Sequence, residues 1–140
     1  MKVLIVEDNL FYSELLEYAM ERKNHDVTCC SNSDKAISLL KEEGVGFDLV
    51  ILDYNLMGGT ADPIIQYMQS LKDPPKTLAN TSVKCAPTLS KLRSSFISRV
   101  LSKDNEPIKS IEYLLMDVSK TKRSSGFSVI NFANLLKFQF

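Results

Sequence analysis

The chain has no tryptophan, a single histidine and only five glycines in 140 residues, and its 17 basic and 17 acidic side chains leave no net charge. This balance gives no support to binding of nucleic acid or a membrane surface by the chain as a whole. No apolar run approaches the roughly 18 residues that a membrane span needs. Acidic residues also follow the first apolar run too early for a signal peptide. We therefore expect a soluble cytoplasmic protein.

Cysteine is scarce as well, and its spacing does not suggest a metal site. The three cysteines, Cys29, Cys30 and Cys85, form no CxxC pair. His25 lies in a probable turn, and we expect it at the surface. Zinc therefore has no support, and the cysteines are expected to be buried free thiols in a reducing compartment.

Short apolar runs alternate along the chain with segments of helical periodicity. Strands are predicted at residues 2–6, 26–30, 47–52, 77–83 and 96–101, and helices at 10–20, 31–43, 60–71, 87–95 and 105–118. The first helix is predicted from the spacing of Leu10, Phe11, Leu15, Tyr18 and Ala19. Thr60 is expected to cap the third helix. Five strand–helix units in series predict an α/β fold, with a parallel sheet covered by helices on both faces.

Acidic residues stand at the ends of two predicted strands. Glu7 and Asp8 follow the first strand and Asp53 follows the third, and open parallel sheets bind ligands beyond the carboxyl ends of their strands. If these strands are neighbours, the three carboxylates meet and repel, so the site needs a proton or, as we favour, a cation. Three hard oxygen donors with room for water suit Mg²⁺.

Thr81 and Lys103 end the fourth and fifth predicted strands, at the same edge of the sheet. Lys103 and a cation would neutralise charge on a phosphoryl group, while Thr81 donates a hydrogen bond to it. Asp53 itself can be the nucleophile and become an acyl phosphate. Spacing alone selects Thr81 in this polar strand, and Ser82 and Thr77 remain alternatives.

Residues 1–118 resemble the receiver domains of two-component response regulators. The segment VLIVEDN resembles the first strand with its acidic pair, DLVILDYN the strand with the phosphoacceptor, and VLSKD the strand with the lysine. The resemblance implies a doubly wound, flavodoxin-like fold with a five-stranded parallel sheet of order 2-1-3-4-5. It also implies that Asp53 accepts phosphate from a phosphohistidine of a sensor histidine kinase or a histidine phosphotransfer protein.

The same resemblance assigns the groups around Mg²⁺. Asp8 and Asp53 would bind the ion directly, Glu7 through water and Asn55 through its backbone carbonyl. Thr81 and Lys103 would hold the phosphoryl oxygens. The domain would then be a switch whose two states present different surfaces to its partners.

Four features depart from the usual pattern of this family, and they include Asp104, where proline often follows the lysine, and a fourth strand that is more polar than usual. Met57 stands where members often have proline, and Val100 stands where an aromatic side chain usually changes rotamer on activation. Val100 and the polar fourth strand support an alternative function, a receiver-fold interaction module that works without phosphate. A Mg²⁺-dependent phosphatase or phosphotransferase is a third class. We expect no enzyme beyond Mg²⁺-dependent self-phosphorylation and autodephosphorylation.

The resemblance does not reach the end of the chain. Residues 119–126 are expected to be a polar, basic linker, and residues 127–140, FSVINFANLLKFQF, an apolar tail. Exposed apolar segments of this kind usually mark interaction surfaces. The tail, with helix slightly favoured over strand, is expected to pack on its own domain or on a second copy as a homodimer.

Overall fold

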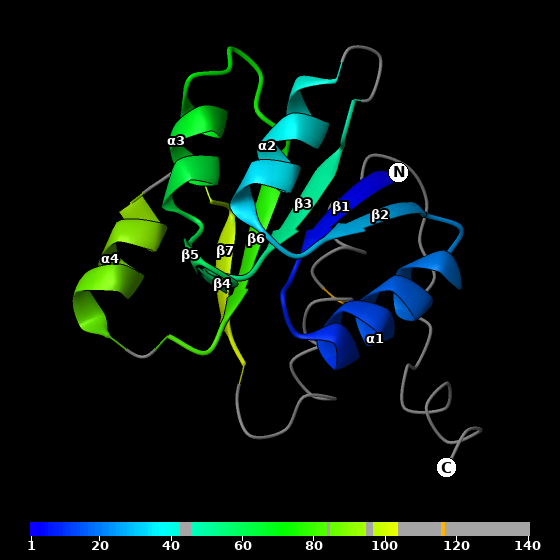
Figure 1. Ribbon diagram of the computed structural model, residues 1–140, viewed down its shortest axis with the longest axis horizontal. Helices are drawn as coiled ribbons and strands as arrows, with labels where there is room; N and C mark the ends of the chain where they lie inside the picture. The colour runs from blue at the N-terminus through cyan, green and yellow to red at the C-terminus, as the bar shows by residue number, and fades with distance from the viewer. Residues whose placement is uncertain (43–45, 84, 95–96, 104–115, 117–140) are drawn as a thin grey trace.

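A computed structural model describes residues 1–42, 46–83, 85–94, 97–103 and 116 of the chain. Five parallel strands form one sheet in the order β2-β1-β3-β6-β7 (Figure 1). They are β1 (Lys2–Val6), β2 (Asp26–Cys30), β3 (Leu49–Leu52), β6 (Lys76–Thr81) and β7 (Arg99–Ser102). Counted among themselves, these strands have the order 2-1-3-4-5, so the predicted topology is confirmed.

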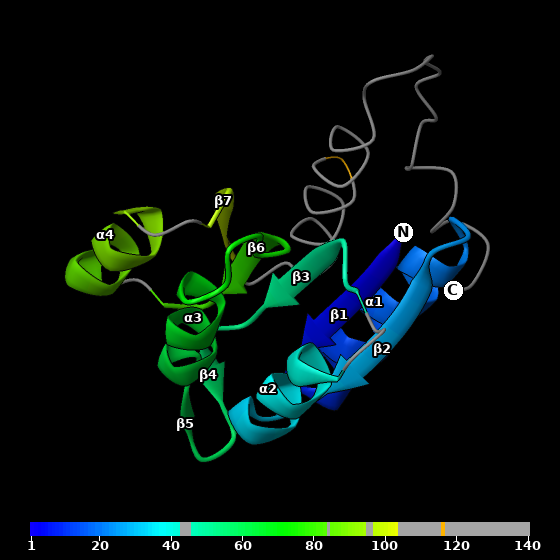
Figure 2. The same ribbon diagram turned by 90° about the horizontal axis from the view of Figure 1, so that it is seen from above.

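Helices cover both faces of this sheet (Figure 2). They are α1 (Leu10–Glu21), α2 (Ser33–Lys41), α3 (Asp62–Gln69) and α4 (Ala86–Ser94). Alternate strand residues point to opposite faces, so Val3 and Ile5 of β1 pack with α1. Leu4 and Val6 belong to the second core, which α2, α3 and α4 cover. The central strands are therefore apolar on both faces, as parallel strands usually are. Among the described helices, none is long and apolar enough to cross a membrane.

A small hairpin that the sequence analysis did not predict joins β3 to α3. Its strands are β4 (Asn55–Leu56) and β5 (Gly59–Thr60), paired antiparallel. Met57 and Gly58 form the turn, and Gly58 has φ 86°. A residue with a side chain rarely adopts this left-handed conformation, so glycine suits the turn.

The first helix is confirmed, but of the five apolar residues whose spacing predicted it, only Leu15 and Ala19 pack against the core. Leu10 and Phe11 are 71% and 60% exposed, and Tyr18 is also exposed. The residues that reach the core follow the i, i+3, i+4, i+7, i+8 pattern of one helical face: Tyr12, Leu15, Leu16, Ala19 and Met20. Because most positions of this helix are apolar, two overlapping patterns fit the sequence, and only packing selects one.

Three smaller predictions are also corrected. His25 is buried rather than at the surface, because the turn after α1 folds back and the His25 N–H donates to the Met20 carbonyl at 3.2 Å. Cys85 is exposed, because it precedes α4, outside the two cores; Cys29 and Cys30 are half-buried, and all three thiols are free. Ala61 rather than Thr60 is the N-cap of α3. The Thr60 hydroxyl still accepts from the Asp62 N–H, at 3.4 Å.

Several predicted segments lie outside the described residues. They are most of the helix predicted over 105–118, of which Met116 alone is described as helical, the linker at 119–126 and the tail at 127–140. Their predicted boundaries therefore stay predictions.

Candidate functional site

A buried cluster of charged side chains lies at the carboxyl edge of the sheet. The Lys103 ammonium, directly after β7, is 2.7 Å from the Asp53 carboxylate, directly after β3. It also bonds the carboxylate of Glu7, directly after β1. The side chains of Glu7, Asp53 and Lys103 are only 2%, 6% and 9% exposed. Three strand ends that are distant in the sequence thus converge on one ion-pair cluster, at the edge of the sheet where these residues were expected.

Backbone hydrogen bonds hold the two buried carboxylates in place. The Asp53 N–H continues the ladder by donating to the Val6 carbonyl at 2.9 Å. The Asn55 N–H then turns back to donate to the Asp53 carboxylate at 3.3 Å. At the end of β1 the Asn9 N–H donates to the Glu7 carboxylate at 3.1 Å. Both side chains are therefore set by the backbone that immediately follows their strands.

Asp8 adds a third carboxylate from the solvent side. It is exposed, yet carboxylate oxygens of Glu7, Asp8 and Asp53 all lie within 4.8 Å of one another. Among the described residues, three carboxylates face one ammonium, so the cluster can accept a further cation. Oxygen donors alone, with one side open to water, match the coordination that Mg²⁺ prefers. The residues present therefore fit a magnesium site.

The charges and burial of the cluster raise the pKa values of two of its members, Glu7 and Lys103. Burial raises the pKa of Glu7 above its ordinary value of 4.5, although the bonded Lys103 opposes this shift. Burial alone would lower the pKa of Lys103, but its bonds to Asp53 and Glu7 outweigh burial and raise that pKa above 10.5. Lys103 thus stays protonated at neutral pH and supplies a fixed positive charge beside Asp53.

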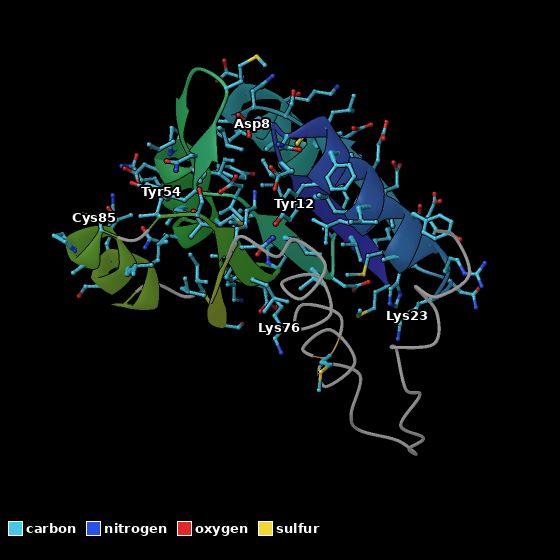
Figure 3. All side chains as sticks on the ribbon, turned by 90° about the horizontal axis from the view of Figure 1, so that it is seen from below. Asp8, Tyr12, Lys23, Tyr54, Lys76 and Cys85 are labelled. Carbon is cyan, nitrogen blue, oxygen red and sulfur yellow. The ribbon has the colours of Figure 1, made fainter. Side chains whose placement is uncertain are left out.

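Tyr12 is a site residue that the sequence analysis missed. The Lys103 ammonium lies 4.7 Å from the centre of its ring, within the range of a cation–π contact. Figure 3 shows Tyr12 on α1, the helix whose start follows Asp8. No sequence pattern marks such a contact, because it depends on how α1 lies across the strand ends.

Thr81 and Asn55, the other two predicted site residues, lie at the same edge. Thr81 is the last residue of β6 and is fully buried, whereas Ser82 is exposed and Thr77 lies near the opposite end of the strand. The Thr81 hydroxyl accepts from the Val83 N–H at 3.3 Å. An oxygen that accepts this bond can still donate its own proton. Asn55 is exposed at the start of the hairpin.

A second polar group links the end of β3 to two helices. The Tyr54 hydroxyl is 3.3 Å from the Asp62 carboxylate at the start of α3. The Lys91 ammonium of α4 bonds the same carboxylate at 2.7 Å. This group is more exposed than the cluster around Asp53 and shares no residue with it.

The strand order and the acidic edge together are those of a two-component signalling domain. The chain belongs to the response regulator receiver domain family, whose model matches residues 3–115. A receiver domain is a signalling module rather than an enzyme.

Individual relatives agree with this assignment. The chain is 31% identical over 72 residues to the two-component response regulator ARR14 of Arabidopsis thaliana, covering 51% of this chain and 19% of that protein. It spans a fifth or less of the length of the curated relatives it matches. Among solved structures, the Mn²⁺-bound response regulator Rcp1 has a TM-score of 0.78 at 14% identity, covering 91% of this chain and 99% of that one. TrrA of Thermotoga maritima, solved with Mg²⁺ and BeF, has a TM-score of 0.68 at 22% identity, with 85% and 96% covered.

Proposed function

We propose that this chain is a phosphoacceptor switch in which Asp53 receives a phosphoryl group from a phosphohistidine of a sensor kinase or phosphotransfer protein. An Asp53 oxygen attacks phosphorus, the phosphorus–nitrogen bond breaks, and the imidazole leaves with the electron pair. The observation that carries the proposal is the burial of Asp53 beside Glu7 and Asp8, with the Lys103 ammonium 2.7 Å from its carboxylate.

Each residue of the cluster has a separate role in this proposal. Glu7, Asp8, Asp53 and the Asn55 carbonyl would hold Mg²⁺, which neutralises charge on the transferring oxygens when bound. Lys103 is already protonated and in contact with Asp53, so it can bind a phosphoryl oxygen without first being charged. Thr81, at the end of β6, would donate its hydroxyl proton to another phosphoryl oxygen.

A surface beside the site supports docking of a phosphodonor protein. Leu10 and Phe11 begin α1, two and three residues after Asp8, and are 71% and 60% exposed. Exposed apolar residues that gather in one place usually mark a protein contact. We propose that the kinase or phosphotransfer protein contacts this end of α1. The cytoplasmic location remains a prediction from the sequence.

Intact-mass spectrometry after incubation with acetyl phosphate tests the function. The wild-type chain should gain the mass of one phosphate with Mg²⁺ and none with EDTA, and Asp53→Asn should gain none. Asp48→Asn is the matched control, because Asp48 precedes the same strand and accepts from the Lys2 N–H at the opposite edge. It should be labelled like the wild type.

Equal labelling of wild type and Asp53→Asn would overturn the phosphoacceptor role. A folded wild type that takes no phosphate from any donor would instead favour the interaction module that works without phosphate. Val100 is the observation that favours this alternative, because it lacks the aromatic ring usual at this position and is half-buried against the core.

A further inference from the structure

Asn80 has a buried side-chain amide that takes no part in the site described above. It lies on β6 directly before Thr81 and is 1% exposed. Neither its Nδ2 nor its Oδ1 has a hydrogen-bond partner in the described part of the chain. Buried polar groups are almost always hydrogen-bonded, so an unpaired amide in a central strand calls for a physical explanation.

The strand register places this amide beside the charged cluster. Leu52 of β3 pairs with Ala79 of β6, so the next residues, Asp53 and Asn80, are neighbours across the two strands. Residues two apart in a strand point to the same face. Asp53 lies two residues after Ile51 and Asn80 two residues after Leu78, and both of these belong to the core under α1. Asn80 therefore lies on the face that carries Asp53.

The path of the Lys103 side chain passes the same point. In the sheet, β6 lies between β7 and β3. Lys103 follows β7 and bonds Asp53 after β3 and Glu7 after β1. Its side chain must therefore cross the end of β6, the strand that carries Asn80. An unpaired hydrogen-bond acceptor thus lies on the strand that separates Lys103 from its partner Asp53.

Binding of a cation would change the hydrogen-bond acceptors that are available to the Lys103 ammonium. A divalent ion held beside Glu7 would compete with the Lys103 ammonium for the Glu7 carboxylate, so the attraction between Lys103 and Glu7 would weaken when the ion binds. An ammonium has three donors and requires another acceptor in a buried site. Asn80 Oδ1 is positioned to be that acceptor, and Nδ2 can then donate toward Asp53 or a phosphoryl oxygen on it.

We propose that Asn80 is a positioning residue that takes over Lys103 from Glu7 and holds the ammonium against the phosphorylated Asp53. The proposal rests on the proposed function. It explains why an unpaired amide is kept in the core: the amide is unsatisfied in the free state and bonded in the loaded state. Asn80 should therefore destabilise the free state, in which its amide is unpaired, and stabilise the loaded state, in which its amide is bonded.

The test compares melting temperatures of the whole chain in EDTA and in Mg²⁺ with beryllofluoride, an acyl phosphate mimic. Asn80→Leu keeps the approximate shape and removes both polar atoms. In EDTA it should melt at the same temperature as the wild type or higher, because no unpaired amide remains buried. The rise in melting temperature on adding Mg²⁺ and beryllofluoride should be smaller for Asn80→Leu than for the wild type. The apparent affinity for beryllofluoride should fall about tenfold or more, which is the effect of losing one hydrogen bond to a charged group.

Thr77→Val is the matched control on the same strand. Thr77 is also fully buried but donates to the Pro75 carbonyl at 3.1 Å, near the opposite end of β6. This variant should melt lower than the wild type in EDTA and keep the full rise with beryllofluoride. A rise for Asn80→Leu equal to that of the wild type would overturn the proposal.

A second measurement separates positioning from packing. If Asn80 acts through Lys103, then Asn80→Leu should not reduce beryllofluoride affinity further in a Lys103→Met background, because coupled residues are not additive. Additive losses would show that Asn80 acts independently of Lys103 and would overturn the proposed role. A wild type that neither takes phosphate on Asp53 nor responds to beryllofluoride would instead reject the underlying phosphoacceptor function.

Discussion

Lys103 supplies the positive charge that compensates two carboxylates placed almost out of reach of water. Glu7 and Asp53 have side chains that are 2% and 6% exposed, and Lys103 bonds both. Burial has already raised the pKa of Glu7 despite this partner. Removing the ammonium would leave two like charges facing each other in a poorly solvated site, which is far more costly than losing a surface ion pair.

Lys103→Met should therefore lower the free energy of unfolding in EDTA by roughly 3–5 kcal/mol, the usual cost of removing one partner from a buried ion pair. Mg²⁺ should restore more stability to this variant than to the wild type, because the competing ammonium is gone and the carboxylates remain. Urea unfolding with and without Mg²⁺ measures both effects.

Lys91→Met provides the control for this comparison, because Lys91 also pairs with an aspartate, Asp62, but its side chain is 56% exposed. It should change stability little and should not alter the response to Mg²⁺. If the two lysine variants lost equal stability, or if Lys103→Met bound Mg²⁺ more weakly than the wild type, the compensating role of Lys103 would be wrong.

At the scale of elements, the first two strands were predicted most accurately, whereas the other strands of the five-stranded sheet and the described helices were predicted to within three residues of their observed ends. Residues 2–6 and 26–30 were predicted with the observed bounds, because short β-branched runs have few alternative readings. Of the five apolar residues that predicted α1, only Leu15 and Ala19 reach the core, because apolar residues occupy more than one side of this helix. The β4–β5 hairpin was missed because strands of two residues have no periodicity to detect.

The same distinction applies to the site. Glu7, Asp8, Asp53 and Lys103 could be placed together from the sequence because parallel strands end at a common edge. Tyr12 and Asn80 could not. The contact between Tyr12 and Lys103 depends on how α1 is oriented over that edge. The lack of hydrogen-bond partners for Asn80 depends on which residues surround it in the folded sheet.

The hairpin turn offers a test of backbone geometry at this scale. Gly58 has φ +86°, and a Cβ added there would meet no atom within 4 Å. Gly58→Ala should therefore destabilise the domain by about 1–2 kcal/mol through backbone strain alone. Gly59→Ala is the control, since its Cβ also meets nothing within 4 Å and no left-handed φ is required. Thermal unfolding of both variants gives the comparison, and equal losses would exclude strain at Gly58 as the cause.

At the scale of the whole molecule, the family match ends at residue 115 and the apolar segment 127–140 lies beyond it. Burying a phenylalanine is worth roughly 1.5–3 kcal/mol, and this segment contains four, at positions 127, 132, 138 and 140. Deleting residues 120–140 should therefore lower either the melting temperature or the mass measured by light scattering.

A full-length variant with serine at these four positions controls for chain length. It should reproduce the effect of the deletion, because the proposed contact is apolar. If neither variant changes mass or melting temperature, the segment packs neither on its own domain nor on a second copy.

The ion pairs of Lys103 also bear on how the domain folds. Its partners Glu7 and Asp53 are 96 and 50 positions away in the sequence, so these contacts close most of the described chain. Contacts of such long range are slow to form, because the entropy of closing the loop is lost before they contribute. Interactions that form after the folding transition state act mainly on the rate of unfolding. During synthesis, a nascent chain can contain β1 and β3 long before β7 has left the ribosome. The charged site therefore exists only once the last strand of the sheet is in place.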